Sequence, residues 1–412
     1  MDSRSGLNFK RIDILGLWSW YTDRSRIPSF ILFYNAFYLL YQLVYLCVVQ
    51  SVRLFIDTNE LEVTVEKFLT ICIDLEPCVK IIVLLCMEKE IKELLLVFRR
   101  DFLICAKIAP EKALKIFESS DKLCNKVTYM VFIMVWATLI GYQLAPLTEC
   151  FLSDCKYLKT IPDWHPFDES QQPAKLLTFL VDSGSLWFTC LSECSIMILI
   201  LSFSSAVGAQ IDVLAACLES VGEVAQRRTA ARSERKPSLQ EVEEMDRLVI
   251  ECIRGHQQML RVADLMESVF SLLNLFQMLL STILICTCGF MLMIALTDST
   301  TEVSETPVQS FIRISKHLCF FSSMTRQLTI FSWAGFVVND KTGNLQEVFY
   351  SSDWTGMSQK TKRQLLIAMT RANKPSKVTA GKFYVVSLQS YAAIMRASYT
   401  YFTMLYRLTA AK

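Results

Sequence analysis

Apolar runs of membrane-crossing length, separated by charged and polar segments, dominate the pattern of this chain. Three runs reach the roughly 20 residues that a helix needs to span a bilayer and contain no charged residue: residues 27–52, 127–148 and 268–297. Residues 195–211 form a fourth charge-free run, which ends an apolar stretch that begins near Leu176. The pattern predicts transmembrane helices at these four positions.

Three further apolar runs contain charged residues and are weaker candidates: residues 68–87, 310–338 and 383–405. The connecting segments support them, because Lys and Arg accumulate on the cytoplasmic side of a membrane. With seven spans, one alternate set of segments holds 28 Lys and Arg residues, and the opposite set holds 5. The richer set comprises residues 1–26, 88–124, 209–267 and 338–378. We therefore predict an all-α membrane protein with seven transmembrane helices, a cytoplasmic amino terminus and an extracellular carboxyl terminus.

The composition agrees with this class of protein. Of the 412 residues, 52% are hydrophobic and 20% are charged, and the mean hydropathy is +0.34. A soluble domain typically has about a quarter of its residues charged, so a soluble protein is not expected. The net charge of +2 offers no overall field that would attract nucleic acid. Arg4, Lys10 and Arg11 precede an apolar run that is too long for the core of a signal peptide, so none is expected.

Motifs of enzymes and of metal sites are missing from the sequence. The 12 glycines never form GxG, and neither a phosphate-binding GxxxxGK[ST] loop nor a GxSxG nucleophile motif occurs. The 3 histidines lie far apart, and the 15 cysteines include no CxxC spacing. We expect no enzymatic activity, no metal and no cofactor, and we interpret most cysteines as small packing residues. Cys150 and Cys155 lie in a predicted outer loop, where a disulfide is one of several outcomes.

Seven spans are also typical of G-protein-coupled receptors, which place the amino terminus outside the cell. The predicted cytoplasmic amino terminus argues against that class, as does the absence of a DRY-like motif and of NPxxY. A transporter or another kind of channel is the alternative that composition alone leaves open.

Residues 349–408 resemble the carboxyl-terminal signature of insect odorant receptors. The matching elements are Tyr350–Trp354, a basic amphipathic helix that ends at Lys374-Pro375, Thr379–Phe383, Ser387-Leu388 and Ser398–Phe402. Weaker matches lie upstream, at Leu15–Trp18 and Ile161–Asp168. The inverted topology of that family agrees with the orientation that the Lys and Arg distribution indicates.

The resemblance implies an odorant-binding subunit of a ligand-gated, non-selective cation channel, which forms a heterotetramer with a shared co-receptor. It further implies a multi-pass protein of the plasma membrane in olfactory neuron dendrites, with volatile organic ligands and no nucleic-acid partner. The co-receptor has a long insertion between its fourth and fifth spans, and residues 209–267 show no such insertion. We therefore interpret the chain as a tuning subunit. A gustatory-type receptor channel of the same topology is the alternative.

The resemblance also implies where the sites lie. An apolar odorant cavity is expected in the outer half of the second, third, fourth and sixth spans, and the predicted topology selects its lining candidates. They are Phe68, Cys72, Trp136, Leu139, Ile140, Phe179, Ser183, Trp187, Phe311 and Ser315. The last span is expected to line the pore, with Met404 and Leu408 as a hydrophobic gate and Arg407 beside them. For each cavity candidate, ordinary helix packing or lipid contact is the alternative. For Met404 and Leu408 the alternative is an ordinary apolar stripe at a helix end, and for Arg407 an anchor at the membrane interface.

The predicted organisation has three regions: residues 1–337 form the bundle with the ligand cavity, residues 338–378 a cytoplasmic anchor, and residues 379–412 the pore helix with a short outer tail. Within the anchor, Ser358 is expected to cap a helix that ends near Asn373. A helix that lies on the membrane surface is the alternative for this segment.

Charged residues inside the predicted spans point to function by default, because a membrane interior makes an unpaired charge costly. Glu76 and Lys80 are four residues apart in a predicted helix, so we expect them to form a structural pair. Asp74, Asp182 and Glu193 have no partner that the sequence identifies.

Overall fold

The computed structural model describes residues 37, 40–45, 50–52, 61–100, 105–152, 173–229, 238–301 and 307–410. Most of the predicted first span, residues 27–52, therefore lies outside the described residues, as do Cys155 and the segment Ile161–Asp168. The described elements are almost entirely helical. They are α4 (Leu61–Cys86), α5 (Glu88–Arg100), η5 (Cys105–Lys107), α6 (Pro110–Leu152), α7 (Ala174–Thr229), α8 (Leu239–Thr301), α9 (Pro307–Gly343), α10 (Leu345–Tyr350), α11 (Gln359–Ala372), β1 (Thr379–Ala380), β2 (Tyr384–Val385) and α12 (Leu388–Ala410).

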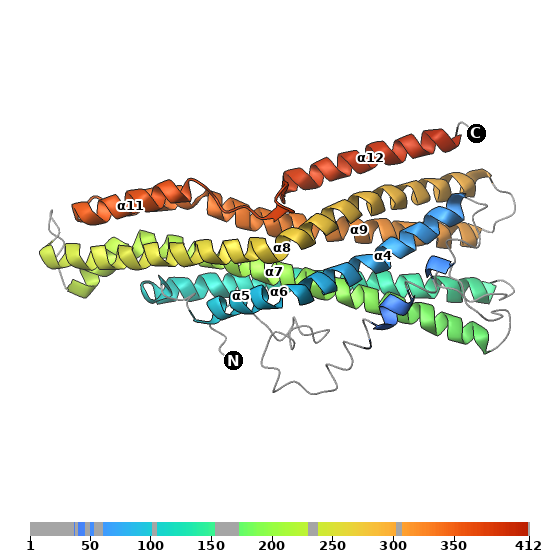
Figure 1. Cartoon of the computed structure of the whole chain (residues 1–412), viewed down its shortest axis with the longest axis horizontal. Helices are drawn as coiled ribbons and strands as arrows, with labels where there is room; N and C mark the ends of the chain where they lie inside the picture. The colour runs from blue at the N-terminus through green and yellow to red at the C-terminus, as the bar shows by residue number, and fades with distance from the viewer. Residues whose placement is uncertain are drawn as a thin grey trace.

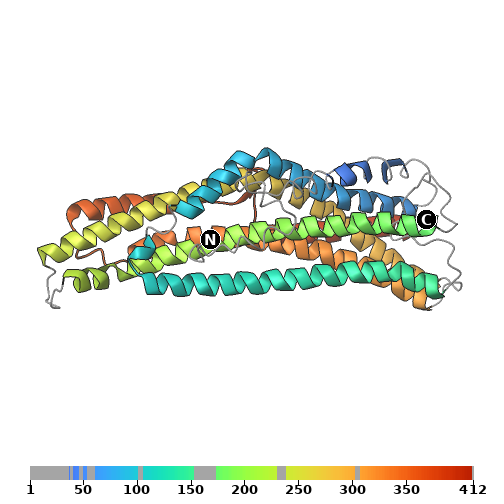
Figure 2. The same cartoon turned by 90° about the horizontal axis from the view of Figure 1, so that it is seen from below.

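The helices form an elongated bundle, and the longest of them run along its long axis (Figure 1). Helices α6 and α7 lie side by side for much of this length (Figure 2). Helix α11 lies at the opposite end of the bundle from the carboxyl end of α12 (Figure 1). The second to seventh predicted spans each fall on a described helix, namely α4, α6, α7, α8, α9 and α12. Of the helices in the described ranges, α6, α7 and α8 are long and apolar enough to cross a membrane by length and composition.

Helices α7 and α8 extend far beyond a membrane. Helix α8 has 63 residues and α7 has 56. At 1.5 Å per residue, α8 is about 95 Å long, whereas the hydrocarbon core is about 30 Å thick. The predicted connecting segment, residues 209–267, is therefore mostly a continuation of these two helices. Its apolar residues are buried between helices, as Cys217, Leu248 and Cys252 illustrate.

The start of the last helix differs from the predicted span, which began at residue 383. Helix α12 begins at Leu388, because the preceding residues form an antiparallel hairpin in which Thr379 pairs with Val385 and Ala380 with Tyr384. The turn is sharp, since Gly381 and Lys382 both adopt positive φ angles, of 61° and 65°. The Gly381 amide donates to the Ser271 carbonyl of α8 at 2.8 Å, which fixes the hairpin against the bundle.

Polar side chains from two helices hold this hairpin. Asn339 of α9 accepts a hydrogen bond from the Val378 amide and donates one to the Val386 carbonyl, both at 2.8 Å. Glu267 of α8 accepts from the Thr379 amide at 2.8 Å. The position at which α12 leaves the bundle is therefore set by α8 and α9.

Helix α11 forms as predicted. The Ser358 hydroxyl accepts a hydrogen bond from the Thr361 amide at 3.3 Å, and the helix ends with Asn373 as its carboxyl cap. One face, which includes Leu365, Ala368 and Ala372, is buried against the bundle, where α8 and α10 are its neighbours. The predicted cap is confirmed.

Candidate ligand-binding cavity

A cavity of about 70 Å³ lies between α4, α6, α7 and α9. These helices carry the second, third, fourth and sixth predicted spans. Its wall is mostly apolar and also includes hydroxyl, amide and charged groups. The lining residues are Ile73 and Glu76 of α4; Val135, Thr138, Leu139 and Tyr142 of α6; Leu186, Thr189, Cys190, Glu193 and Met197 of α7; and Phe320, Ser323, Met324, Arg326 and Gln327 of α9.

The apolar wall is formed by tightly packed rings and branched side chains. The Tyr142 and Phe320 rings meet edge to face, with centroids 4.6 Å apart. Leu139 and Leu186 are buried beside them in the same cluster. Covering this surface with an apolar molecule is favourable, by about 25 cal/mol per Å² of apolar area removed from water.

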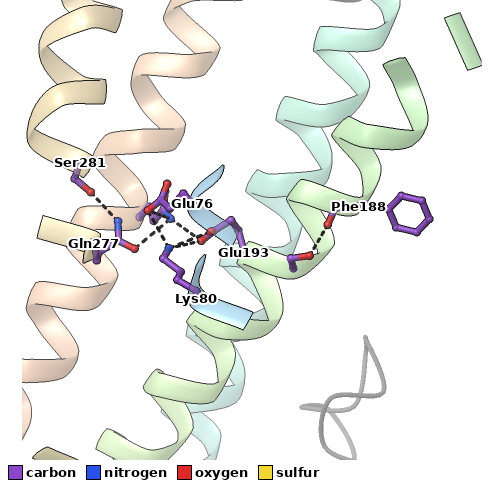
Figure 3. Close-up of polar contacts among 8 residues, drawn as sticks. Glu76, Lys80, Phe188, Glu193, Gln277 and Ser281 are labelled. Atoms are coloured by element: carbon purple, nitrogen blue, oxygen red, sulfur yellow. Dashed lines mark hydrogen bonds and ion pairs between the residues drawn. The ribbon is translucent and has the colours of Figure 1, made fainter. Parts of the chain in front are cut away.

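A buried ion cluster contributes Glu76 and Glu193 to the cavity wall. Figure 3 shows the contacts of this cluster. The Lys80 Nζ lies 2.9 Å from the Glu76 carboxylate and 2.8 Å from the Glu193 carboxylate. The Lys80 side chain is fully buried, and its ammonium also faces the Phe331 ring at 5.0 Å. The predicted pairing of Glu76 with Lys80 is thus confirmed, and Glu193 of α7 completes it. Because the two carboxylates share one ammonium, each is partly neutralised by a buried cation.

Gln277 of α8 and Gln327 of α9 extend this ion cluster by hydrogen bonds. The Gln327 Nε2 lies within hydrogen-bond distance of Glu76 at 3.0 Å, Glu193 at 2.6 Å and the Gln277 Oε1 at 3.2 Å. Gln277 in turn donates to the Ser281 hydroxyl at 2.7 Å. Four helices therefore meet in one connected polar network, as Figure 3 shows.

Asp74 and Asp182 are buried outside this ion cluster, and each has its own hydrogen-bond partners. Asp74 accepts hydrogen bonds from Thr189 and Gln50, each at 2.6 Å. Asp182 accepts from the Tyr45 hydroxyl at 3.1 Å. Asp74 and Asp182 do not line the cavity, and these bonds give each of them a structural role.

Arg326 lies in the cavity wall on α9, near Cys190 and Cys194 of α7. Its Nε is buried and has no hydrogen-bond partner among the described residues. An arginine without a carboxylate partner inside a membrane span is unusual, because such charges almost always pair with another group or face water.

The predicted ligand contacts occupy varied positions around this cavity. Leu139 lines it. Trp136 and Trp187 are next to lining residues and contact each other, with ring centroids 4.9 Å apart. Cys72 and Ser183 are buried, and Phe179 and Ser315 are half-buried, all outside the wall. Phe68, Ile140 and Phe311 are exposed on the outer surface of the chain, away from the cavity.

The sequence reasoning did not select the polar lining residues. The sequence presents Glu193 only as a charge within a predicted span, and Arg326 only as one of the charges in the weaker candidate span, residues 310–338. The burial cost of each charge was the available signal. The sequence could not indicate that Glu193 would meet Lys80 while Arg326 would meet no carboxylate.

Helix α12 packs on α8 through one face and leaves the other uncovered. The Ser398 hydroxyl donates to the Thr282 carbonyl at 3.3 Å, and Phe402 packs against Gly289. Met404 and Arg407, two of the predicted pore residues, lie on the exposed side. The side chain of Leu408 lies outside the described part of the structure.

A family model described as 7tm Odorant receptor matches residues 62–399. Among curated proteins, Odorant receptor 2a of Drosophila melanogaster is 27% identical over 165 residues, which cover 40% of this chain and 39% of that protein. Odorant receptor 10 of Aedes albopictus is 23% identical over 162 residues, which cover 39% of this chain and 40% of that protein. The matched stretch therefore spans about two fifths of these relatives' own length.

Odorant receptor 49a of Drosophila melanogaster aligns over a longer stretch, with 21% identity over 287 residues that cover 68% of this chain and 65% of that protein. Among solved structures, the insect olfactory receptor OR5 from Machilis hrabei in complex with eugenol superposes with a TM-score of 0.75 and 15% identity. The superposition covers 99% of this chain and 100% of that one, so the two share their fold over the full length. The prediction of an all-α membrane protein with seven transmembrane helices is confirmed.

Proposed function

Because the chain belongs to the 7tm Odorant receptor family, we propose that it is the odorant-binding subunit of a ligand-gated, non-selective cation channel. Family membership makes it a membrane receptor of olfaction and not an enzyme. The ligand site, the pore and the assembly with other subunits are the parts that we propose beyond family membership.

The cavity between α4, α6, α7 and α9 is the observation that carries the proposal. It is mostly apolar, lies inside a membrane bundle and has a few convergent polar groups, which is the usual composition of a small-molecule site. We assign the volatile ligand to this cavity. Leu139 is the predicted residue that lines it directly, and Trp136 and Trp187 support the wall from behind. The other seven predicted contacts are not part of this proposed wall.

The pore is proposed along α12. A helix that packs on only one face in the single chain has its other face available for neighbouring subunits, and Met404 and Arg407 lie on that face. Four subunits that place this face around a common axis would line a conduction path with α12. In this arrangement Met404 and Leu408 narrow the path, and Arg407 lies at its mouth.

Contacts connect the proposed cavity with the proposed pore helix. Gln327 of the cavity wall lies 3.2 Å from Gln277 of α8, and further along α8 the Thr282 carbonyl accepts from Ser398 of α12. A change in the position of Gln327 on ligand binding therefore acts on α8, which holds α12.

We assign the chain to the tuning subunits that assemble with a shared co-receptor in a heterotetramer. The short connection between α7 and α8, residues 230–238, supports this assignment, because the long insertion of the co-receptor would fall there. Residues 338–378, which contain α10 and α11, are proposed as the inner anchor between subunits. Residues 1–337 then form the bundle and residues 379–412 the pore region.

The bias of Lys and Arg supports an inverted orientation, with the amino terminus and α11 inside the cell. The plasma membrane of olfactory neuron dendrites is the location that family membership implies. Staining of an amino-terminal epitope on intact cells would contradict this orientation.

Patch-clamp recording of cells that express this chain with the co-receptor tests the proposed function. We expect cation currents that are evoked by volatile organic compounds and that require both chains. Surface-expressed protein without any such current across a broad panel would refute the channel proposal.

A further inference from the structure

Several hydroxyl and amide donors in the cavity wall are engaged within the protein, whereas Arg326 is not. Thr189 donates to Asp74 at 2.6 Å, Thr138 donates to the Met134 carbonyl at 2.8 Å, and Ser323 lies 3.5 Å from Thr138. Gln327 is held by the ion cluster. Arg326 has no hydrogen bond or ion pair to any residue that the structure describes, and its Nε is buried.

An unsatisfied donor of this kind is costly. A buried polar group without a partner destabilises the protein, and more strongly when it is charged. A molecule that enters the cavity and accepts a hydrogen bond from Arg326 removes that cost. A hydrocarbon of the same shape leaves it in place.

The charges around the cavity identify the kind of acceptor. Glu76 and Glu193 share the single ammonium of Lys80, so the ion cluster holds one net negative charge. The guanidinium of Arg326 balances this charge from another part of the wall, without a direct ion pair. A neutral ligand preserves the balance. A carboxylate ligand would add a second negative charge near Glu193, and an ammonium ligand would meet Arg326 as a like charge.

We infer that this cavity selects neutral, mostly apolar molecules with one carbonyl oxygen, as in a ketone or an ester, and that Arg326 donates to this oxygen. The inference rests on the proposed function, because it specifies the ligand class of the same cavity. Apolar atoms of the ligand contact Leu139, Leu186 and Phe320, and the carbonyl end faces α9.

Binding to the purified full chain in lipid nanodiscs tests this inference independently of current. The probes are small cyclic and linear ketones. Each ketone is compared with an alkane, a carboxylate and an amine that have the same carbon skeleton. The readout is the dissociation constant from ligand-dependent thermal stabilisation. We expect at least one ketone to bind more tightly than its alkane, carboxylate and amine counterparts.

Variants of Arg326 test whether its N–H groups cause the preference for ketones. Arg326→Met keeps an extended side chain but removes every donor, so the ketone should bind about 10- to 100-fold more weakly and the alkane about as before. Arg326→Gln retains one neutral donor and should restore part of the difference. Arg313→Met, on the same helix but outside the wall, is the matched control and should leave ketone binding unchanged.

Three outcomes would overturn the inference: no ketone binds to the wild-type chain, the carboxylate or the amine binds more tightly than the ketone, or Arg326→Met weakens ketone and alkane equally. If Arg326→Met does not fold, the comparison with Arg326→Gln decides. Selective ketone binding without any odorant-evoked current would refute the channel proposal and leave the ligand class established.

Discussion

Lys80 of α4 and Glu193 of α7 are separated by 113 positions in the sequence, and yet the Lys80 ammonium donates to both Glu193 carboxylate oxygens, at 2.8 and 3.0 Å. The bond joins two helices that line the cavity. Its consequences for stability can be measured directly.

Substitution of Lys80 by Met should destabilise the folded protein by about 3–5 kcal/mol, because two buried carboxylates lose their shared cation. Glu193→Gln should cost less, since Glu76 still pairs with Lys80 at 2.9 Å. Unfolding of purified protein in detergent, followed by helical circular dichroism, measures both changes. Lys115→Met, at an exposed position of α6, is the control. Equal effects of Lys80→Met and the control would show that the ion cluster contributes nothing to stability.

Gly335 of α9 should not tolerate a larger side chain. A Cβ at this position would lie 2.7 Å from the Val386 carbonyl oxygen, at the end of the hairpin that precedes α12. We expect Gly335→Ala to destabilise the protein by about 1–3 kcal/mol through overpacking. Gly141→Ala is the matched control, because a Cβ there meets nothing within 4 Å. A midpoint of thermal unfolding for Gly335→Ala at or above that of Gly141→Ala would contradict the prediction.

Protonation of His256 should destabilise the part of the bundle that packs against α10 and α11. Burial, together with Arg371, lowers the pKa of His256 to about 4, and its ring meets Phe349 edge to face at 5.0 Å. The unfolded chain therefore binds a proton more readily than the folded chain, so stability is complete above the unfolded pKa of about 6.5 and declines as the pH falls toward 4. Between pH 7 and pH 5 the expected loss is about 2 kcal/mol.

His256→Phe keeps an aromatic ring and removes this proton site. Thermal unfolding at pH 7 and pH 5 should show a smaller decrease in the midpoint for His256→Phe than for the wild type. Identical decreases in the two proteins would assign the acid sensitivity to other groups.

Removal of the cap on α11 should loosen that helix. Ser358→Ala deletes the oxygen that accepts from the Thr361 amide, and loss of such a cap costs about 1 kcal/mol. Hydrogen exchange should increase in residues 359–363 and remain unchanged in α12. Ser119→Ala, at an exposed interior position of α6, serves as the control for the loss of a hydroxyl. Unchanged exchange at α11 would mean that packing on α8 alone fixes its start.

Arg407→Gln should raise single-channel conductance or divalent permeability in the proposed heterotetramer. An arginine stays charged at physiological pH, and near a narrow pore mouth it opposes the entry of cations. The rank order of ligands should not change, because the cavity lies between other helices. A Met404 substitution is the positive control for a pore effect. If Met404 variants alter conductance and Arg407→Gln does not, Arg407 is an anchor at the membrane interface.

Hydropathy and the Lys and Arg bias were sufficient to predict the helical spans, since a bilayer requires long apolar helices. The same requirement for apolar residues makes it impossible to tell from the sequence which face of each helix points inward and which points to lipid. Leu139 is 3% exposed and lines the cavity, while its neighbour Ile140 is 49% exposed on the outer surface. Lipid tails are as apolar as a protein core, so the two positions look alike in the sequence.

Contacts between distant segments were also beyond sequence reasoning. The pair Glu76 and Lys80 could be predicted from helical spacing, whereas Glu193 joins them only through the packing of α7 on α4. The late start of α12 has a similar cause, because the Val386 backbone bonds with Asn339 and Val378 favour a hairpin over the first turn of a helix.

Because α8 is one uninterrupted helix, a small rotation at one position displaces its distant end by a larger distance. Gln277 touches the cavity network, and Leu239 begins the helix 38 residues earlier, about 57 Å away along the axis. If α8 pivots at Gln277 as a stiff rod, a tilt of about 5° moves its inner end by about 5 Å. A small rotation of α8 at the level of the cavity network would therefore become a displacement of several ångströms at Leu239.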